Sequence, residues 1–131
     1  MFVTACVPLR LRSTANLREH WAQKASRIKT ERYAAFYGLC EVSPAWNQWE
    51  TSPLRVTITR IAPRTLDDDN LVSCCKAVRD GIAQWLDTPD NDPSITWVYA
   101  QRREGVGEYA VEMTVEAVHD EKEFGNGNTI A

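Results

Sequence analysis

The chain has 131 residues, of which 44% are hydrophobic and 25% are charged. This length and composition favour one globular domain over a disordered or fibrous chain. No apolar run approaches the roughly 20 residues that span a bilayer, and the N-terminus lacks the basic and apolar regions of a signal peptide. We therefore expect a single cytoplasmic domain over residues 1–120, with no membrane partner, and a flexible tail over residues 121–131.

The first half of the chain predicts a strand, a long helix and a second strand. Residues 2–8 are β-prone, and apolar residues then recur at helical spacing from Ser13 or Thr14 to about Leu39. The apolar positions of this helix include Trp21, Ala25, Ile28, Ala35 and Leu39. Residues 41–53 predict a loop, and residues 54–61 alternate apolar and polar side chains, as a half-buried strand does.

The second half predicts one more helix and two more strands. The helix is expected from Asp67 to about Leu86, followed by a turn-rich loop over residues 87–93 and a strand over residues 95–102. The segment 105–107, Gly-Val-Gly, predicts a hairpin turn into a last strand over residues 108–118. The order β-α-β-α-β-β predicts an α/β (α+β) fold in which two helices flank a small mixed sheet.

The four cysteines predict reduced thiols rather than a metal site. Cys6, Cys40, Cys74 and Cys75 contain no C-x-x-C spacing and are accompanied by only two histidines, so the pattern does not favour zinc. Cys74 and Cys75 fall on the apolar side of the second predicted helix, where the ordinary interpretation is a pair of small core residues.

The net charge of −3 does not by itself favour a nucleic-acid partner, because such domains are usually basic. The charges are unevenly distributed, however: residues 1–32 hold seven basic and two acidic side chains, and residues 104–131 hold one basic and seven acidic. This pattern indicates either a surface for a polyanion or an ordinary solvated helix face. The residues of this surface, which the family resemblance described below implies as DNA-binding, are Arg12, Asn16, Arg18, Lys24, Arg27, Lys29 and Arg32.

Three consecutive aspartates, Asp67, Asp68 and Asp69, stand where a strand has ended and a helix begins. One or two of them could simply cap the helix and favour the positive end of its dipole. Three crowded carboxylates repel one another unless a cation lies among them, and Mg²⁺ is a hard cation that takes oxygen ligands. The run therefore predicts a Mg²⁺ site.

Further charged residues accompany this run on the predicted helix and in the loop after it. Lys76 and Asp80 are four residues apart on the polar side, so they indicate either a solvated ion pair or a lysine that steadies a scissile phosphate near the metal. Asp90 and Asp92 lie in a segment whose composition is typical of a turn. The segment lacks the glycine and the glutamate of a calcium-binding loop.

These segments together resemble the RusA family of Holliday junction resolvases, in particular its phage and prophage forms. The resemblance rests on Asp67–Leu71 (a D-x-D-N motif), on Lys76–Ile82 with its lysine and aspartate, and on Asp90 shortly before a strand. The opening Pro8–Asn16, followed by a basic helix, also resembles this family. The resemblance covers roughly residues 3–118, and its three motifs occur in the family's order.

The resemblance implies a homodimeric, Mg²⁺-dependent endonuclease, with Mn²⁺ as a substitute, that binds branched DNA and resolves four-way junctions in recombination and repair. It implies Asp67, Asp69 and Asp90 as metal ligands, and the same three with Lys76 as catalytic residues. The auxiliary residues that it implies are Asn70, Asp80 and Asp92.

The sequence departs from the family at two positions and leaves two other functions open. Lys76 lies seven residues after Asp69, where the compact family pattern has four, and the family's D-D pair is here Pro89-Asp90, so Asp92 is a possible substitute ligand. A protein that binds DNA junctions but cleaves them poorly is the second hypothesis. A metal or calcium module without a nucleic-acid partner is the third.

Overall fold

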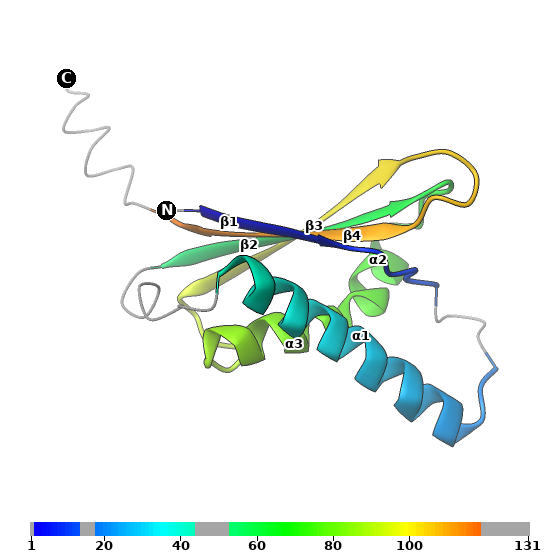
Figure 1. Cartoon of the computed structure of the whole chain (residues 1–131), viewed down its shortest axis with the longest axis horizontal. Coiled ribbons are helices and arrows are strands. Elements are labelled where there is room, and N and C mark those ends of the chain that lie inside the picture. The colour runs from blue at the N-terminus through cyan, green and yellow to red at the C-terminus, as the bar shows by residue number, and fades with distance from the viewer. Residues whose placement is uncertain (1, 14–17, 44–52, 119–131) are drawn as a thin grey trace.

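The computed structural model describes residues 2–13, 18–43 and 53–118. Within these residues the helices and strands are, in chain order, β1 (Phe2–Val7), α1 (Trp21–Val42), β2 (Leu54–Ala62), α2 (Asp68–Cys74), α3 (Lys76–Leu86), β3 (Ile95–Arg103) and β4 (Ala110–Ala117). Figure 1 shows α1 and α3 on one side of the sheet. The predicted mixed α/β class is therefore confirmed, with three helices in the described part of the chain rather than two.

The four strands form one open mixed sheet in the order β1-β4-β2-β3. β2 is parallel to β3 and antiparallel to β4, and β4 is antiparallel to β1. The predicted hairpin between the last two strands is wrong, because β2 lies between them. Gly107 has a φ of 82°, and the Glu108 N–H bonds the Gly105 carbonyl at 3.0 Å, so a tight turn is present. The connection nevertheless crosses the end of β2, because the preceding helices have already placed β3 parallel to β2 on its free edge.

The second predicted helix is divided at Cys75 into α2 and α3. The Cys75 N–H bonds the carbonyls of Val72 and Ser73 instead of continuing the regular helical ladder. Cys74 and Cys75 are 4% and 0% exposed, so the expectation of core cysteines is confirmed. Successive residues of an unbroken helix point about 100° apart, so a break allows both neighbours to face the core. The hydrogen bond to Cys74, together with burial, raises the pKa of the Cys75 thiol, and all four cysteines are free of disulfides.

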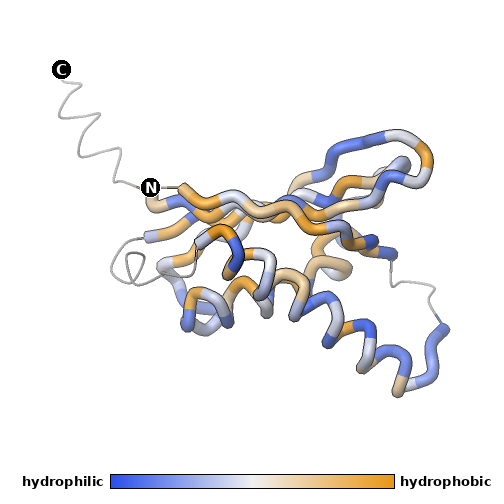
Figure 2. The backbone as a smooth tube through the Cα atoms, in the orientation of Figure 1, coloured by the Kyte–Doolittle hydropathy of each residue, from blue (hydrophilic) through white to orange (hydrophobic). Residues whose placement is uncertain are grey.

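Helix α1 begins later than predicted, and its first half projects from the body of the protein. Residues 18–20 are not helical, and His20 caps the helix by accepting the Ala22 N–H at Nδ1. Trp21 is 76% exposed and Ala25 is exposed, so the prediction that they face the core is wrong, whereas Ala35 and Leu39 are fully buried. Figures 1 and 2 show why the two ends of α1 differ in burial: its N-terminal half is mostly hydrophilic and extends beyond the sheet.

The core lies between the sheet and the C-terminal half of α1 together with α3. The alternation predicted for residues 54–61 is confirmed by buried Leu54, Val56 and Ile58 on one face of β2. The fully buried partners from β4 and α3 are Val111, Met113, Val115, Val78 and Ile82. Within the described residues, no helix combines the length and apolar character needed to cross a membrane.

Candidate functional site

The segment between β2 and α2 is fixed to the edge strand β3. The Gln101 side chain accepts the Leu66 N–H at 2.8 Å and donates to the Leu66 carbonyl at 2.8 Å. Two hydrogen bonds to one backbone residue leave that residue little freedom to rotate. The acidic run that starts one residue later is thus positioned by the sheet.

Asp67, the first residue of this run, is the N-cap of α2. Its Oδ1 accepts the Asn70 N–H at 3.0 Å, which satisfies one of the free donors of the first helical turn. Asp68 and Asp69 follow in that turn and are exposed. Among the described residues, neither has an ion-pair partner. The capping interpretation accounts for Asp67 and leaves two carboxylates facing solvent.

Charged side chains of α3 and of the loop after it form an ion-pair cluster. The Lys76 Nζ lies 2.9 Å from Oδ1 of Asp80 and 3.1 Å from Oδ2 of Asp90, and Arg79 Nε donates to the same Asp90 oxygen at 2.9 Å. The hydrogen bond from Lys76 lowers the pKa of Asp90, and the hydrogen bond to Asp80 raises the pKa of Lys76. Lys76 and Asp90 are therefore both charged at neutral pH.

Arg79 also holds the Asp90 loop against β3. The Asp90 carbonyl accepts hydrogen bonds at 2.9 Å from Arg79 Nη2 and from Trp97 Nε1. The Arg79 guanidinium lies 4.6 Å from the centre of the Trp97 ring and donates to the Tyr99 hydroxyl at 2.8 Å. The sequence interpretation missed Arg79, Trp97 and Tyr99. A usable signal was present, because Trp97, Tyr99 and Gln101 alternate along β3 and so share one face.

Asp92 has a structural role in the loop. Its Oδ1 accepts both the N–H and the hydroxyl of Ser94, at 2.8 and 2.7 Å, and these bonds lower the pKa of Asp92. Asp87 ends α3 in the left-handed conformation, with a φ of 55°, and donates its N–H to the Ala83 and Gln84 carbonyls. The turn chemistry expected for this acidic segment is thus present at Asp92.

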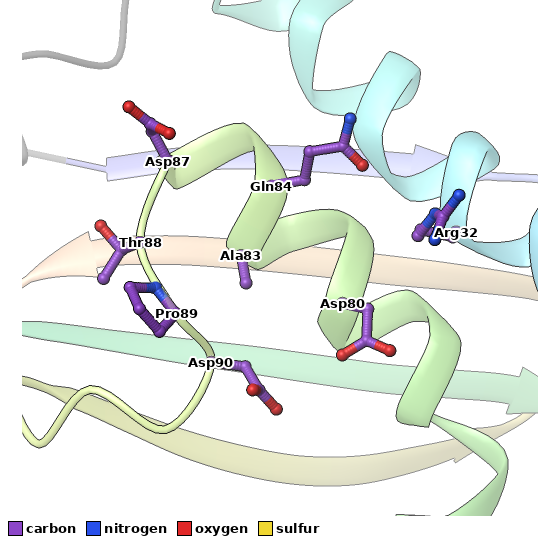
Figure 3. A pocket seen from close by; sticks show the side chains of 8 residues that line it. All are labelled: Arg32, Asp80, Ala83, Gln84, Asp87, Thr88, Pro89 and Asp90. Atoms are coloured by element: carbon purple, nitrogen blue, oxygen red, sulfur yellow. The ribbon is translucent and has the colours of Figure 1, made fainter.

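A pocket of about 460 Å³ lies beside this cluster, between α1 and α3 (Figure 3). Its charged lining consists of Arg32 from α1, Asp80 from α3, and Asp87 and Asp90 at the two ends of the following turn. The Arg32 Nε is buried and has no hydrogen-bond partner among the described residues. Asp80 lines this pocket (Figure 3) and also pairs with the Lys76 ammonium at 2.9 Å.

The predicted basic surface divides into exposed and paired residues. Arg12, Arg18, Lys24 and Lys29 are exposed, and Asn16 lies outside the described residues. Arg32 is half-buried and lines the pocket between α1 and α3. Arg27 bonds both oxygens of Glu19, at 2.9 and 3.0 Å, and lies 3.4 Å from Glu31. The charge available to a partner therefore comes mainly from Arg12, Arg18 and the projecting half of α1.

One groove connects this basic helix with the ion-pair cluster. It has a volume of about 330 Å³ and lies between α1 and the junction of α2 with α3. Lys24 and Lys76 both line it, together with Ser73 and Asp80. Two ammonium groups in one groove are suited to the phosphates of a polyanion.

Replacement of Glu31 by glutamine is expected to stabilise the protein modestly at pH 7, because it removes a buried charge while Arg27 keeps its two bonds to Glu19. Glu31 is 4% exposed, and burial raises its pKa. The fold therefore favours the neutral, protonated form of Glu31. The stability that this form contributes is fully present below the ordinary carboxyl pKa and is lost as the pH rises through the raised pKa. The advantage of Glu31→Gln should disappear below about pH 4.5, as urea unfolding at several pH values would measure.

Glu19→Gln is the control of opposite sign. The hydrogen bond from Arg27 lowers the pKa of Glu19, so the charged form stabilises the fold and its contribution is lost as the pH falls through the lowered value. Glu19→Gln should therefore destabilise at pH 7. Equal effects of the two substitutions would contradict the burial of the Glu31 charge.

The structure brings some of the predicted site residues together and leaves others apart. Lys76, Asp80 and Asp90 are in direct contact. In the described part of the chain, no three His, Cys, Asp or Glu side chains are close enough to hold a metal ion. Asp67, Asp69 and Asp90 thus do not form a ready-made site of three carboxylates, and their role as metal ligands stays a prediction.

Comparison with known proteins adds information on the fold alone. No known protein family and no curated protein matches the sequence. The GDP-form protofilament structure of TubZ from Bacillus thuringiensis serovar israelensis is similar, with a TM-score of 0.51 and 12% identity, over 97% of this chain and 28% of that chain. The GTPγS-form protofilament of TubZ gives a TM-score of 0.42 at 17% identity, again over 28% of its length. The fold of this chain defines a two-layer α/β domain. The chain spans just over a quarter of the length of the TubZ structures.

Proposed function

We propose that this chain is a Mg²⁺-dependent, structure-selective endodeoxyribonuclease that resolves four-way DNA junctions by paired symmetric nicks. The resemblance of its motifs to the RusA family supports the proposal. The observation that carries it is the exposed pair Asp68–Asp69 beside the cap Asp67 at the start of α2. Within the described residues these carboxylates lack the cation partners that Asp80 and Asp90 have.

The side chains at this position fit Mg²⁺. In proteins this ion is usually held by one or two carboxylates, with water and substrate phosphate completing its octahedral shell. Asp67 and Asp69 would supply the two carboxylates, since the Asp67 cap uses only one oxygen. Asp90 would be a third ligand, and Mn²⁺ prefers the same oxygen donors. When bound, such an ion supplies a Lewis acid that activates water and stabilises the leaving oxygen.

The remaining charged residues would bind and orient the DNA. Lys76 is held charged by Asp80 and Asp90, while 63% of its side chain stays exposed and so is accessible to a phosphate. Lys24 lines the same groove and would contact the neighbouring backbone without reading sequence. Hydrolysis would leave 5′-phosphate and 3′-hydroxyl ends. Paired nicks across a symmetric junction call for two active sites, which a homodimer provides.

The test is cleavage of a labelled synthetic four-way junction by the native chain, with Mg²⁺ or with EDTA, and with a linear duplex as control. We expect paired nicks at symmetric positions in the junction, only when Mg²⁺ is present. Retention of the junction without any nick would contradict the nuclease proposal.

One observation favours a second candidate function. Lys76 and Asp90 bond each other in the structure, and among the described residues Asp90 does not form a three-carboxylate group with Asp67 and Asp69. A junction-binding accessory protein of a phage or prophage, with little or no nuclease activity, would need only the basic surface. The same cleavage experiment separates the two functions.

A further inference from the structure

Four arginines line a hollow that lies where β1 and β2 end and that has a volume of about 520 Å³. We call it the arginine hollow and define it by Arg10, Arg12, Arg60 and Arg64, with Tyr109 on its wall. Among its described lining residues there is no aspartate or glutamate. These arginines come from two distant parts of the sequence, and three of them lie outside the predicted DNA-binding set.

Arg60 gives the hollow a fixed, buried positive charge. The residue is 8% exposed, and its guanidinium donates to the carbonyls of Leu11 and Arg64, both at 2.8 Å. Carbonyl oxygens orient the guanidinium without neutralising its charge. Arg60 has no ion pair within the described residues, and because a buried charge is normally paired, an anion would be its complement.

The other three guanidinium groups are also available to an anion. Arg10 lies over the Tyr109 ring at 4.4 Å, a stacking that leaves its N–H edge free to donate. By contrast, Arg55 and Arg102 elsewhere on the sheet are paired with Glu116 and Glu112. Arg10, Arg12 and Arg64 have no ion pair within the described residues.

The acid that interacts with Arg12 does not neutralise the hollow. Arg12 helps to lower the pKa of Glu19, so the two charges interact through space. Both Glu19 oxygens, however, already accept hydrogen bonds from Arg27. Glu19 therefore does not neutralise the arginines of the hollow, and the repulsion between their like charges favours a bound anion.

From these contacts we infer that the arginine hollow binds the phosphodiester backbone of DNA, as a site separate from the acidic run. Guanidinium groups in a fixed arrangement match phosphate oxygens, and several of them side by side suit consecutive phosphates better than one small anion. Leu66 lines the hollow and immediately precedes Asp67, so bound backbone would lead toward the start of α2. The choice of DNA as the polyanion rests on the proposed function.

The test is DNA binding in EDTA, measured by fluorescence anisotropy with a labelled four-way junction. The variant Arg10→Gln/Arg64→Gln removes two exposed charges and keeps the Arg64 carbonyl that holds Arg60. Arg55→Gln/Arg102→Gln is the matched control, because it removes two exposed charges that are already paired. We expect roughly tenfold weaker binding of the first variant at physiological salt. The slope of log affinity against log salt should fall by about 0.9 for each phosphate that the variant no longer neutralises.

The outcomes separate this inference from the nuclease proposal. Equal affinities and salt slopes for the two double variants would overturn the inference, even if the native chain nicks junctions. Loss of binding confined to the hollow variant would support it, even if the native chain never nicks. A parallel titration with a mononucleotide distinguishes the source of phosphate, since tight mononucleotide binding without DNA binding would also overturn the inference.

Discussion

An Asp69→Asn chain is expected to bind a four-way junction as well as the native chain, and to nick it at least about a thousandfold more slowly. Asparagine keeps the size of the side chain but replaces a charged oxygen ligand with an amide, and a lost metal contribution of about 4 kcal/mol gives this factor. The fold should survive, because Asp69 is exposed and its removal costs only the favourable interaction with the helix dipole, about 0.3–1 kcal/mol. Single-turnover cleavage over a range of Mg²⁺ concentrations would measure the loss.

Asp68→Asn is the matched control for this prediction. Asp68 lies in the same helical turn, is likewise exposed to solvent, and carries the same charge, but it occupies the unassigned middle position of the D-x-D-N motif. We expect its cleavage rate to stay within about tenfold of the native rate. Similar losses in the two variants would show that the run acts through its total charge, and that the assignment of Asp69 as a ligand is wrong.

Local patterns in the sequence predicted the elements better than their connections. The alternation over residues 54–61 predicted β2, because one face of that strand packs on the helices. The prediction of a hairpin at Gly105–Gly107 was wrong, because turn residues indicate a local bend and not which strands become neighbours. The prediction that Trp21 faces the core was wrong for a related reason. Helical spacing indicates an apolar face, but only the tertiary structure decides whether the sheet extends far enough to cover that face.

The candidate site shows the same limit. The spacing of Lys76 and Asp80 left an ion pair open as one of two interpretations, and the structure contains that pair at 2.9 Å. The pairing of Arg79 with Asp90 depends on how the loop folds back on α3, which no local spacing encodes. The arginine hollow escaped the sequence interpretation because its arginines come from two segments far apart in the chain, which converge only where β1 and β2 share a sheet through β4.

Replacement of Gly81 by alanine is expected to destabilise the protein by about 1–3 kcal/mol, the usual range for overpacking, although alanine is the better helix former by about 1 kcal/mol. A Cβ at Gly81 would lie 2.3 Å from the Arg32 carbonyl oxygen and 2.9 Å from the Ala35 Cβ, so the backbone of α1 would have to move. Urea unfolding would measure the loss.

Gly105→Ala is the control for the same change of residue type, because its Cβ would meet only the flexible end of Glu108, at 3.8 Å. We expect its effect to stay within about 0.5 kcal/mol. Since α1 carries Lys24 and α3 begins at Lys76, separation of the two helices by Gly81→Ala would also widen the groove that both lysines line. A Gly81→Ala chain as stable as the native protein would contradict the close contact between α1 and α3, and with it the fixed spacing of these two ammonium groups.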